Sequence, residues 1–243
     1  MLVELLTFFP RRGQDGAMKP RSGRVAEDRV FNAVLNAILD HRLAPGTKLV
    51  ERDLSELLGA SRGAVRAALA RLGHSLLVEL RPNRGAVIAN PTAGETRDLF
   101  EARRVIESAV VQRLARNIST KQLAELRAFV ADEQKAYDRG DRRTGQRLSI
   151  RFHKVLSELA GNAELDRFME HLISRTPLLT LAHKGARLAY CGVGEHREVV
   201  EALAKRDPAL ALKRMVAHLR NLEGQLHVEE EPRPAASLAE AFI

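Results

Sequence analysis

Residues 49–72 read LVERDLSELLGASRGAVRAALARL, which divides into two short amphipathic segments at Gly59. In the first segment Leu54, Leu57 and Leu58 form an apolar face, opposite a face of charged residues. Glycine readily adopts the left-handed backbone conformation that ends many helices. The stretch therefore predicts two helices joined by a tight turn.

The second segment carries the residues that suggest a function. Ser61 is a typical N-cap, and Val65 and Leu69 are spaced to lie on the buried side of the helix that follows. Arg62 and Arg66 are four residues apart, so they project together from the exposed side near the N-terminus of this helix. Two helices with arginines early in the second fit the major groove of DNA. Taken alone, the stretch also fits a helical hairpin with a solvated face.

The flanking sequence adds a third helix and a β-hairpin. Apolar residues recur at helical spacing over residues 25–39, and short β-type runs at 76–80 and 86–89 enclose the sequence RPNRG (81–85). Three helices and a hairpin with a basic tip make a winged helix-turn-helix, whose tip would lie along a minor groove or the phosphate backbone. The predicted wing favours DNA binding over the simple helical hairpin.

Asn90 and Pro91 interrupt this pattern, and beyond them apolar residues recur at helical spacing in about six segments. We therefore predict a mainly α fold, an N-terminal winged helix-turn-helix followed by an all-α helical bundle of about six helices. Since the recognisable pattern begins only after Met18, translation starts there or at Met1. The predicted parts are an irregular N-terminal tail (1–23), the winged domain (24–90), the helical domain (91–227) and a flexible C-terminal tail (228–243).

Charge and composition fit a DNA-binding protein. The chain has 243 residues, a formal net charge of +8 and a sequence pI of about 10.1. Residues 1–90 hold 14 Lys and Arg against 9 Asp and Glu, whereas the remainder holds 25 against 22. The basic excess is therefore concentrated in the part of the chain that holds the helix pair, which favours a polyanionic partner such as DNA. A single cysteine, Cys191, excludes an internal disulfide, and no apolar run is long enough to cross a membrane, so we expect a cytoplasmic protein.

Three histidines of the helical domain lie on or beside apolar stripes of separate helices: His153, His196 and His218. Neutral imidazole is a common ligand of zinc, nickel and copper, and metal ligands in bundle cores come from facing helices. One turn before His153, where a carboxylate ligand would be expected, the residue is Ser149. The three histidines therefore indicate either a metal site or buried polar packing.

Arg103 also falls on an apolar stripe, between Leu99 and Ile106. An inward guanidinium needs a partner, because an unpaired buried charge is costly. A carboxylate-bearing ligand would serve, since arginine binds carboxylates through two parallel hydrogen bonds. An internal salt bridge, for example to Glu107, is the alternative.

Together these motifs resemble GntR-type transcription regulators. The run LAPGTKLVERDLSELLGASRGAVRAALARL (43–72) and the wing PNRGAVI (82–88) are similar to the DNA-binding domain of that family. The helical part resembles the FCD ligand-binding domain of the FadR subfamily, and its helix number resembles the VanR-type branch. Its motifs are FEARRVIE (100–107), RFHKVLSELAGN (151–162) and EHREVVEALAKRDPALALKRMVAHL (195–219).

The resemblance implies a homodimer, usually a repressor, that binds a two-fold operator in double-stranded DNA and responds to a small organic acid. It implies no enzymatic activity. Gly63 and Ala64 stand where the family often has Thr-Pro, a departure that bears on the operator sequence. By position, the implied DNA-contacting residues are Arg52, Ser61, Arg62, Arg66, Arg84 and Gly85.

The resemblance also implies an effector site with a divalent metal, zinc or nickel. In the family an aspartate and three histidines hold this metal. The histidines match His153, His196 and His218, but Ser149 stands at the aspartate position. Arg103 matches an arginine that meets the effector or its metal-bound carboxylate.

Two other functions fit parts of the sequence. A metal held by histidines could activate water in a hydrolase, but no carboxylate is placed beside the histidines as a general base. Glu195 adjoins His196, yet neighbouring residues on a helix point apart. A non-specific architectural DNA-binding protein is the other alternative, although such a protein does not need a helical domain with a pocket.

Overall fold

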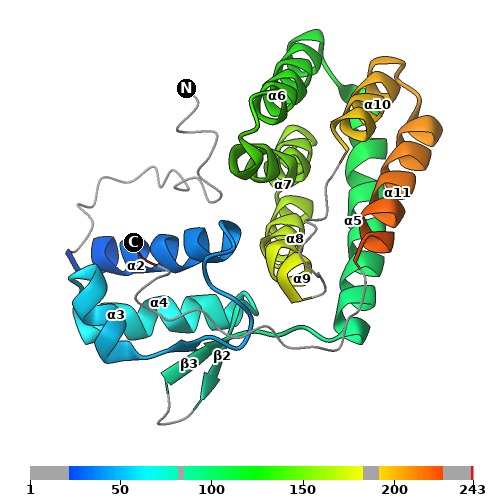
Figure 1. Cartoon of the computed structure of the whole chain (residues 1–243). Coiled ribbons are helices and arrows are strands. Elements are labelled where there is room, and N and C mark those ends of the chain that lie inside the picture. The colour runs from blue at the N-terminus through cyan, green and yellow to red at the C-terminus, as the bar shows by residue number, and fades with distance from the viewer. Residues whose placement is uncertain (1–21, 82–84, 183–191, 227–241, 243) are drawn as a thin grey trace. The chain divides into compact units, whose positions relative to one another are not determined.

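The computed structural model describes residues 22–81, 85–182, 192–226 and 242 (Figure 1). The predicted tails at 1–23 and 228–243 lie almost wholly outside these ranges, as do Met18, Arg84 and Cys191. By their contacts the described residues form two compact units, which part between Thr92 and Ala93. We call residues 22–92 with 177–182 the N-terminal unit, and residues 93–176 with 192–226 the helical unit.

The N-terminal unit is a winged helix-turn-helix, as predicted. A three-stranded antiparallel sheet has the order β1-β3-β2, with Leu49 opposite Ala86 and Arg81 opposite Gly85. Strand β1 was not predicted, because two residues are too short to show an alternating pattern. In chain order the elements are α2 (Ser22–Leu39), β1 (Lys48–Leu49), α3 (Glu51–Leu58), α4 (Arg62–His74), β2 (Val78–Arg81) and β3 (Gly85–Ile88) (Figure 1).

Local capping signals fix the turn between α3 and α4. Gly59 has φ 54° and ψ 42°, the left-handed conformation expected of a helix-ending glycine. The side-chain oxygen of Ser61 accepts a hydrogen bond from the backbone N–H of Ala64 at 3.2 Å, as predicted for an N-cap. Leu54 is fully buried, but the prediction for Leu57 was wrong, since 45% of it is exposed. Helix α3 has only eight residues, and it buries fewer apolar side chains than the sequence pattern predicts.

Helices α2 and α4 pack against each other. Arg71 of α4 binds Glu27 and Asp28 of α2, with N–O distances of 2.9 and 2.6 Å. The same guanidinium lies 4.2 Å from the centroid of the Phe31 ring. Arg29 of α2 also donates a hydrogen bond to the carbonyl of Gly59, at 2.8 Å. These contacts hold the turn and the second helix at a fixed place on the scaffold.

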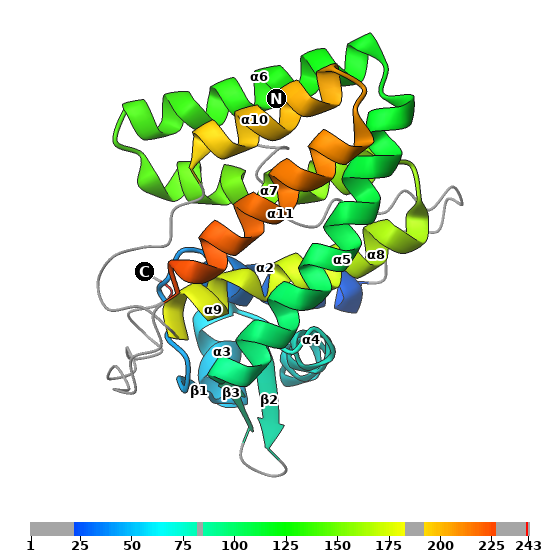
Figure 2. The ribbon, with the colours of Figure 1, turned by 90° about the vertical axis from the view of Figure 1, so that its right-hand side faces the viewer.

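The helical unit contains the six predicted helical segments. Helix α11 packs along α5, α6 packs on α7, and α10 contacts both α6 and α11, as Figure 2 shows for α5, α10 and α11. A further short helix, α9 (Thr176–Ala182), was not predicted, and most of it groups with the N-terminal unit. The helices are α5 (Ala93–Asn117), α6 (Thr120–Asp138), α7 (Arg142–Leu159), α8 (Ala163–Ser174), α10 (Val193–Ala204) and α11 (Pro208–Gly224).

Several helix starts follow directly from the sequence. Ser119 and Gln122 form a complete capping box at the start of α6, and the side chain of Asp207 caps α11 before Pro208. Gly145 lets α7 approach α6, because a Cβ there would lie 2.6 Å from the Tyr137 ring. Among the described helices, none has the length and apolar character needed to cross a membrane.

Candidate metal centre and nucleic-acid interface

The N-terminal end of α4 presents two exposed arginines, Arg62 and Arg66. Arg66 forms a two-pronged ion pair with Glu51 of α3, through Nε–Oε1 at 3.1 Å and Nη2–Oε2 at 2.8 Å. This pairing lowers the pKa of Glu51 and raises that of Arg66. Among the described residues, Arg62 makes no hydrogen bond, so its guanidinium is available to a ligand.

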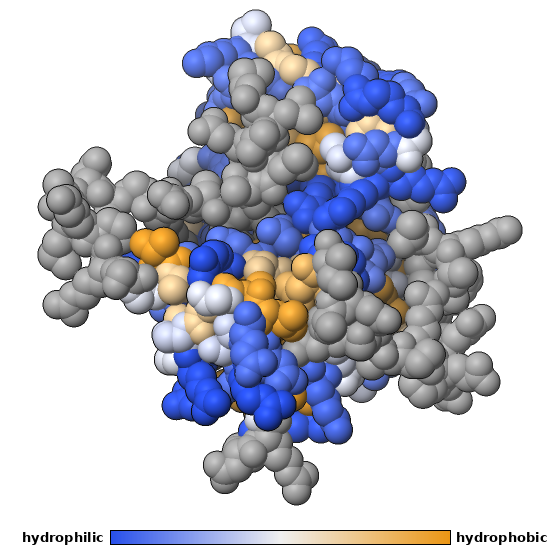
Figure 3. All heavy atoms as spheres, turned by 60° about the vertical axis from the view of Figure 1, so that its left-hand side comes forward, coloured by the Kyte–Doolittle hydropathy of each residue, from blue (hydrophilic) through white to orange (hydrophobic). Residues whose placement is uncertain are grey.

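The other predicted DNA-contacting residues of the helix pair have local partners. The Nε of Arg52 lies 3.1 Å from Oδ1 of its neighbour Asp53, and both side chains are solvent-accessible. Ser61 is exposed and uses its oxygen to cap α4. On the face drawn in Figure 3, hydrophilic side chains lie below an apolar patch near the middle of the view. An exposed ion pair contributes little to stability, so these arginines can exchange a carboxylate for a phosphate.

The predicted wing contact at Arg84 falls outside the described residues. Gly85, at the start of β3, has φ +79°, and a Cβ built on it would lie only 2.7 Å from the carbonyl oxygen of Leu49. The sheet itself therefore requires glycine at this position, because any side chain would collide with β1. Arg81, on the opposite strand of the wing, is exposed and lies 3.8 Å from Glu79.

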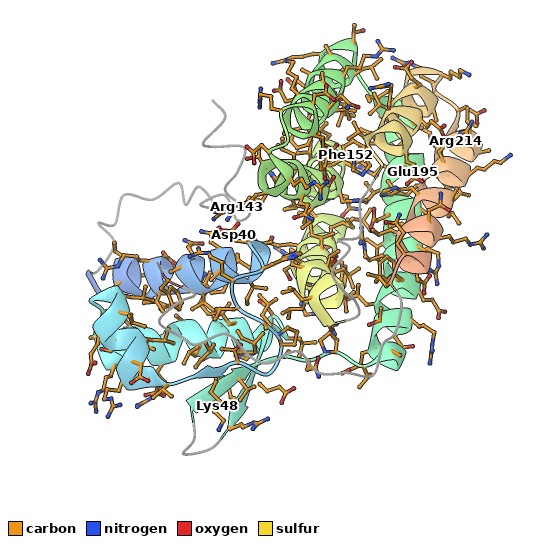
Figure 4. All side chains as sticks on the ribbon, in the orientation of Figure 1. Asp40, Lys48, Arg143, Phe152, Glu195 and Arg214 are labelled. Atoms are coloured by element: carbon orange, nitrogen blue, oxygen red, sulfur yellow. The ribbon has the colours of Figure 1, made fainter. Side chains whose placement is uncertain are left out.

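The three predicted histidines meet in the core of the helical unit. His153 comes from α7, His196 from α10 and His218 from α11, and at most 2% of each residue is exposed. One nitrogen from each lies within 4.8 Å of the others, and the Nε2 atoms of His153 and His218 are 3.3 Å apart. Phe152 stacks on the His196 ring with centroids 4.1 Å apart; Figure 4 labels Phe152 and Glu195 in this part of the bundle.

Each histidine is held by a glutamate from another helix. Nδ1 of His153 lies 2.5 Å from Glu107 of α5, and Nδ1 of His196 lies 2.8 Å from Glu133 of α6. Nδ1 of His218 lies 2.7 Å from Glu195 of α10.

These glutamates also fix the protonation pattern of the imidazole rings. A carboxylate only accepts hydrogen bonds, so each Nδ1 carries the proton and each Nε2 presents a lone pair. One nitrogen of each ring lies within 4.8 Å of the others, so the three rings could serve one metal ion in the manner of carboxylate–histidine–metal triads.

Ser149, at the position where the resemblance places an aspartate, is engaged elsewhere. Its hydroxyl donates a hydrogen bond to Oε1 of Glu133, and the hydroxyl of Tyr137 lies 3.4 Å away. Both Ser149 and Glu133 are buried. The hydroxyl thus contacts a glutamate that itself contacts His196.

Arg103 connects the histidine cluster to a small cavity. Its Nε donates to Oε1 of Glu107 at 2.7 Å, the internal salt bridge that the sequence allowed, and Nη1 lies 3.3 Å from Oγ1 of Thr176. Only 1% of Arg103 is exposed. The cavity has room for about one water molecule. It is lined by Arg103, Ile150, His153, Ile173, Thr176 and Leu222.

Burial and charge together set the ionisation of this cluster. Burial alone would raise the pKa of Glu107, but attraction to Arg103 and His153 outweighs it and lowers the pKa to about 2. Burial lowers the pKa of His153 to about 3, although Glu107 acts in the opposite direction. Burial likewise lowers the pKa of His218. These two imidazoles are therefore neutral near pH 7, the form that binds metal.

The donor set fits a divalent metal ion. The Nε2 atom of His196 is buried and has no hydrogen-bond partner among the described residues. A buried polar atom without a partner is costly, and a cation at the meeting point of the three Nε2 atoms would remove that cost. Neutral imidazoles with carboxylates behind them are ligands that zinc and nickel prefer.

The sequence predicts the three histidines but not the carboxylates that hold them. From the sequence, Glu107 is a candidate partner of Arg103 and Glu195 is a neighbour of His196, whereas in the structure Glu107 also contacts His153 and Glu195 contacts His218. Glu133 is the third of these carboxylates. It falls on the apolar stripe of α6 after Phe129 and Val130, so its position was a signal of an inward carboxylate.

Comparisons with known proteins agree with this architecture. The model of the FCD domain matches residues 98–221, and that of the bacterial regulatory proteins of the gntR family matches residues 26–88.

Individual relatives and solved structures match most of this chain. The HTH-type transcriptional repressor RspR of Escherichia coli (strain K12) is 25% identical over 197 residues, which is 80% of this chain and 86% of that protein. The structure of a transcriptional regulator GntR from Rhodococcus sp. RHA1 has a TM-score of 0.72 at 26% identity, covering 83% of this chain and 97% of that one. The E. coli McbR/YncC structure, with a TM-score of 0.74 at 20% identity over 83% and 96% of the two chains, shares the fold. The chain belongs to the gntR family of bacterial regulatory proteins and carries an FCD domain.

Proposed function

We propose that this protein is a ligand-responsive transcription regulator, a repressor, that acts in the cytoplasm as a homodimer. One observation carries the proposal: a winged helix-turn-helix with exposed arginines at the start of α4 and a domain with a buried three-histidine cluster beside a cavity occur in one chain. Family membership and the repressor RspR among its relatives support this function.

The winged unit is the DNA-binding part of the proposal. Arg62 and Arg66 enter the major groove of a two-fold operator, and the wing lies along the neighbouring backbone. Arg62 makes no hydrogen bond among the described residues, whereas Arg66 is bound to Glu51, so we assign Arg62 the main base contact. The proposed DNA-contacting residues are Arg52, Ser61, Arg62, Arg66, Arg84 and Gly85.

The helical unit is the sensor. His153, His196 and His218 would hold zinc or nickel through Nε2, and the metal would supply a Lewis acid that attracts an anionic oxygen. Arg103 lines the cavity and offers its Nη atoms to the same anion. We therefore propose a small carboxylate as the effector.

This centre is better suited to binding than to hydrolysis. Each glutamate at the cluster is bound to a histidine Nδ1, so none is placed as a general base for an attacking water. Binding of the effector would instead change operator affinity, a coupling that is typically about 1–3 kcal/mol in allosteric proteins.

The proposal is tested by operator selection. The full-length protein would select duplexes from a library of genomic fragments, and the affinity for the selected duplex would be measured by fluorescence anisotropy. We expect Arg62→Ala to weaken specific binding by about 1–3 kcal/mol, the contribution of a good two-pronged base contact. The matched control is Arg127→Ala, which removes an exposed arginine of the helical unit. Failure to enrich any sequence over random duplex would overturn the proposal.

A further inference from the structure

A chain of hydrogen bonds runs from the half-buried Tyr137 to the histidine cluster. The Tyr137 hydroxyl lies 3.4 Å from the hydroxyl of Ser149, which donates to Oε1 of Glu133. Oε2 of Glu133 accepts from Nδ1 of His196 at 2.8 Å. Glu133 and His196 are fully buried, and 3% of Ser149 is exposed. Both oxygens of Glu133 are therefore engaged, one with a hydroxyl and one with an imidazole.

The direction of these bonds decides what Ser149 does. A serine hydroxyl carries a single proton, and here that proton is donated to a carboxylate that is itself bound to a histidine. A carboxylate at position 149 would place a negative charge on α7. In this chain Glu133 of α6 provides that charge instead. It lies behind His196, on the Nδ1 side of the ring.

We propose that Glu133 is a positioning residue of the metal centre, that it acts through Nδ1 of His196, and that Ser149 supports Glu133 instead of binding the metal. The inference rests on the proposed metal site. It follows that three histidines are the whole protein ligand set, and that the remaining coordination positions belong to water or to an exogenous ligand.

Two further contacts support this role. The His196 ring stacks on Phe152 at an interplanar angle of 25°, so stacking and the bond to Glu133 together fix its orientation. With Nδ1 bound to Glu133, only Nε2 remains as a donor atom, and Nε2 is buried with no partner among the described residues. A carboxylate on Nδ1 also strengthens the imidazole as a ligand.

A double-mutant cycle tests the inference, with zinc affinity measured by competition against a chromophoric chelator. We expect Glu133→Gln to weaken zinc binding by about 10- to 100-fold, the usual effect of losing such a partner of a ligand. Ser149→Ala should weaken it less, and should have no further effect when added to Glu133→Gln. The cobalt absorption spectrum should keep its shape in both variants, because neither removes a ligand.

Controls separate a positioning role from damage to the fold. Glu201→Gln, an exposed glutamate of α10 that binds Arg127, should leave zinc affinity unchanged. Circular dichroism of each metal-free variant would show that it folds. A second readout needs no variant: ¹⁵N–¹H spectra of the metal-free protein should show His196 protonated at Nδ1.

The possible failures are distinguishable. A loss on Ser149→Ala that persists in the Glu133→Gln background, with a changed cobalt spectrum, would mean that Ser149 binds the metal, and the inference would be wrong. Wild-type zinc affinity in Glu133→Gln, or a His196 protonated at Nε2, would overturn it while leaving the metal site intact. If the wild-type protein itself binds no zinc, the metal site and the inference both fail.

Discussion

Each histidine of the centre depends on a glutamate that another helix provides. The pairs join α7 to α5, α10 to α6 and α11 to α10, so five helices meet at one cluster. Without their carboxylates the rings could turn, and the three Nε2 atoms would no longer converge. Single substitutions here should therefore have separable effects on metal binding and on stability.

The ligand role of His196 gives the first prediction. His196→Ala should reduce the metal content of protein purified without a His-tag and without chelator from about one ion per chain to a small fraction, because two neutral imidazoles hold zinc poorly. Elemental analysis measures this directly. His171→Ala, at an exposed position of α8, is the matched control. Equal metal content in the two variants would exclude His196 as a ligand.

Arg103 gives a prediction about stability. Arg103→Ala should lower the free energy of unfolding by about 3–5 kcal/mol, because Glu107 would remain as a buried charge without its cation. Urea denaturation measures this loss. Arg104→Ala, which removes a half-buried ion pair with Glu223, should cost much less. If both variants lost the same stability, Arg103 would not be what stabilises the Glu107 carboxylate.

The ion pair between Arg66 and Glu51 gives a prediction about DNA binding. Glu51→Gln should raise the affinity for random duplex and steepen its salt dependence by about one unit of log–log slope, because it frees one more cation for phosphates. Titrations at several salt concentrations measure the slope. Glu56→Gln changes the same charge at another exposed position of α3. A slope that rises equally in both would reflect net charge and not the Arg66 pair.

At the scale of elements, the packing of α7 on α6 depends on one glycine. Gly145→Ala should destabilise the helical unit by about 1–3 kcal/mol, the usual cost of overpacking, because the new Cβ would lie 2.6 Å from the Tyr137 ring. Gly194→Ala on α10 is the control, since its Cβ meets nothing within 4 Å. That change should be neutral or stabilise the helix. Thermal unfolding measures the melting temperatures of both variants, and equal values would contradict the close packing of α7 on α6.

The elements that could be predicted from the sequence are those with local signals. Ser61 marks the start of α4, and the structure confirms this cap; Ser119 and Asp207 give the same kind of local signal at the starts of α6 and α11. Strand β1 and helix α9 carry no such signal, because one is two residues long and the other follows α8 directly.

The candidate site, too, could be predicted from the sequence only in part. The histidines stood out on apolar stripes, but their carboxylate partners lie 23, 46 and 63 residues away along the chain. Pairs so distant follow from the packing of helices, which a single sequence does not give.

At the scale of the whole molecule, α5 is the helix that follows the DNA-binding unit in the chain and also carries residues of the proposed effector site. It carries Arg103 and Glu107 and begins at Ala93, only five residues after β3 of the wing ends at Ile88. Any effector that engages Arg103 therefore acts on the helix that continues the DNA-binding unit in the chain. Since the coupling is a difference in free energy between two bound states, it must appear as a change in operator affinity.

The most direct measurement is the operator affinity of the zinc-loaded protein, titrated with a panel of small carboxylic acids. We predict that at least one acid changes operator affinity by about 5- to 150-fold, the range that allosteric coupling usually spans. The same acid should have no effect on Arg103→Lys, which keeps the charge but loses the planar guanidinium. Operator affinity that no carboxylate alters, in protein shown to contain zinc, would contradict a carboxylate-sensing function of the helical unit.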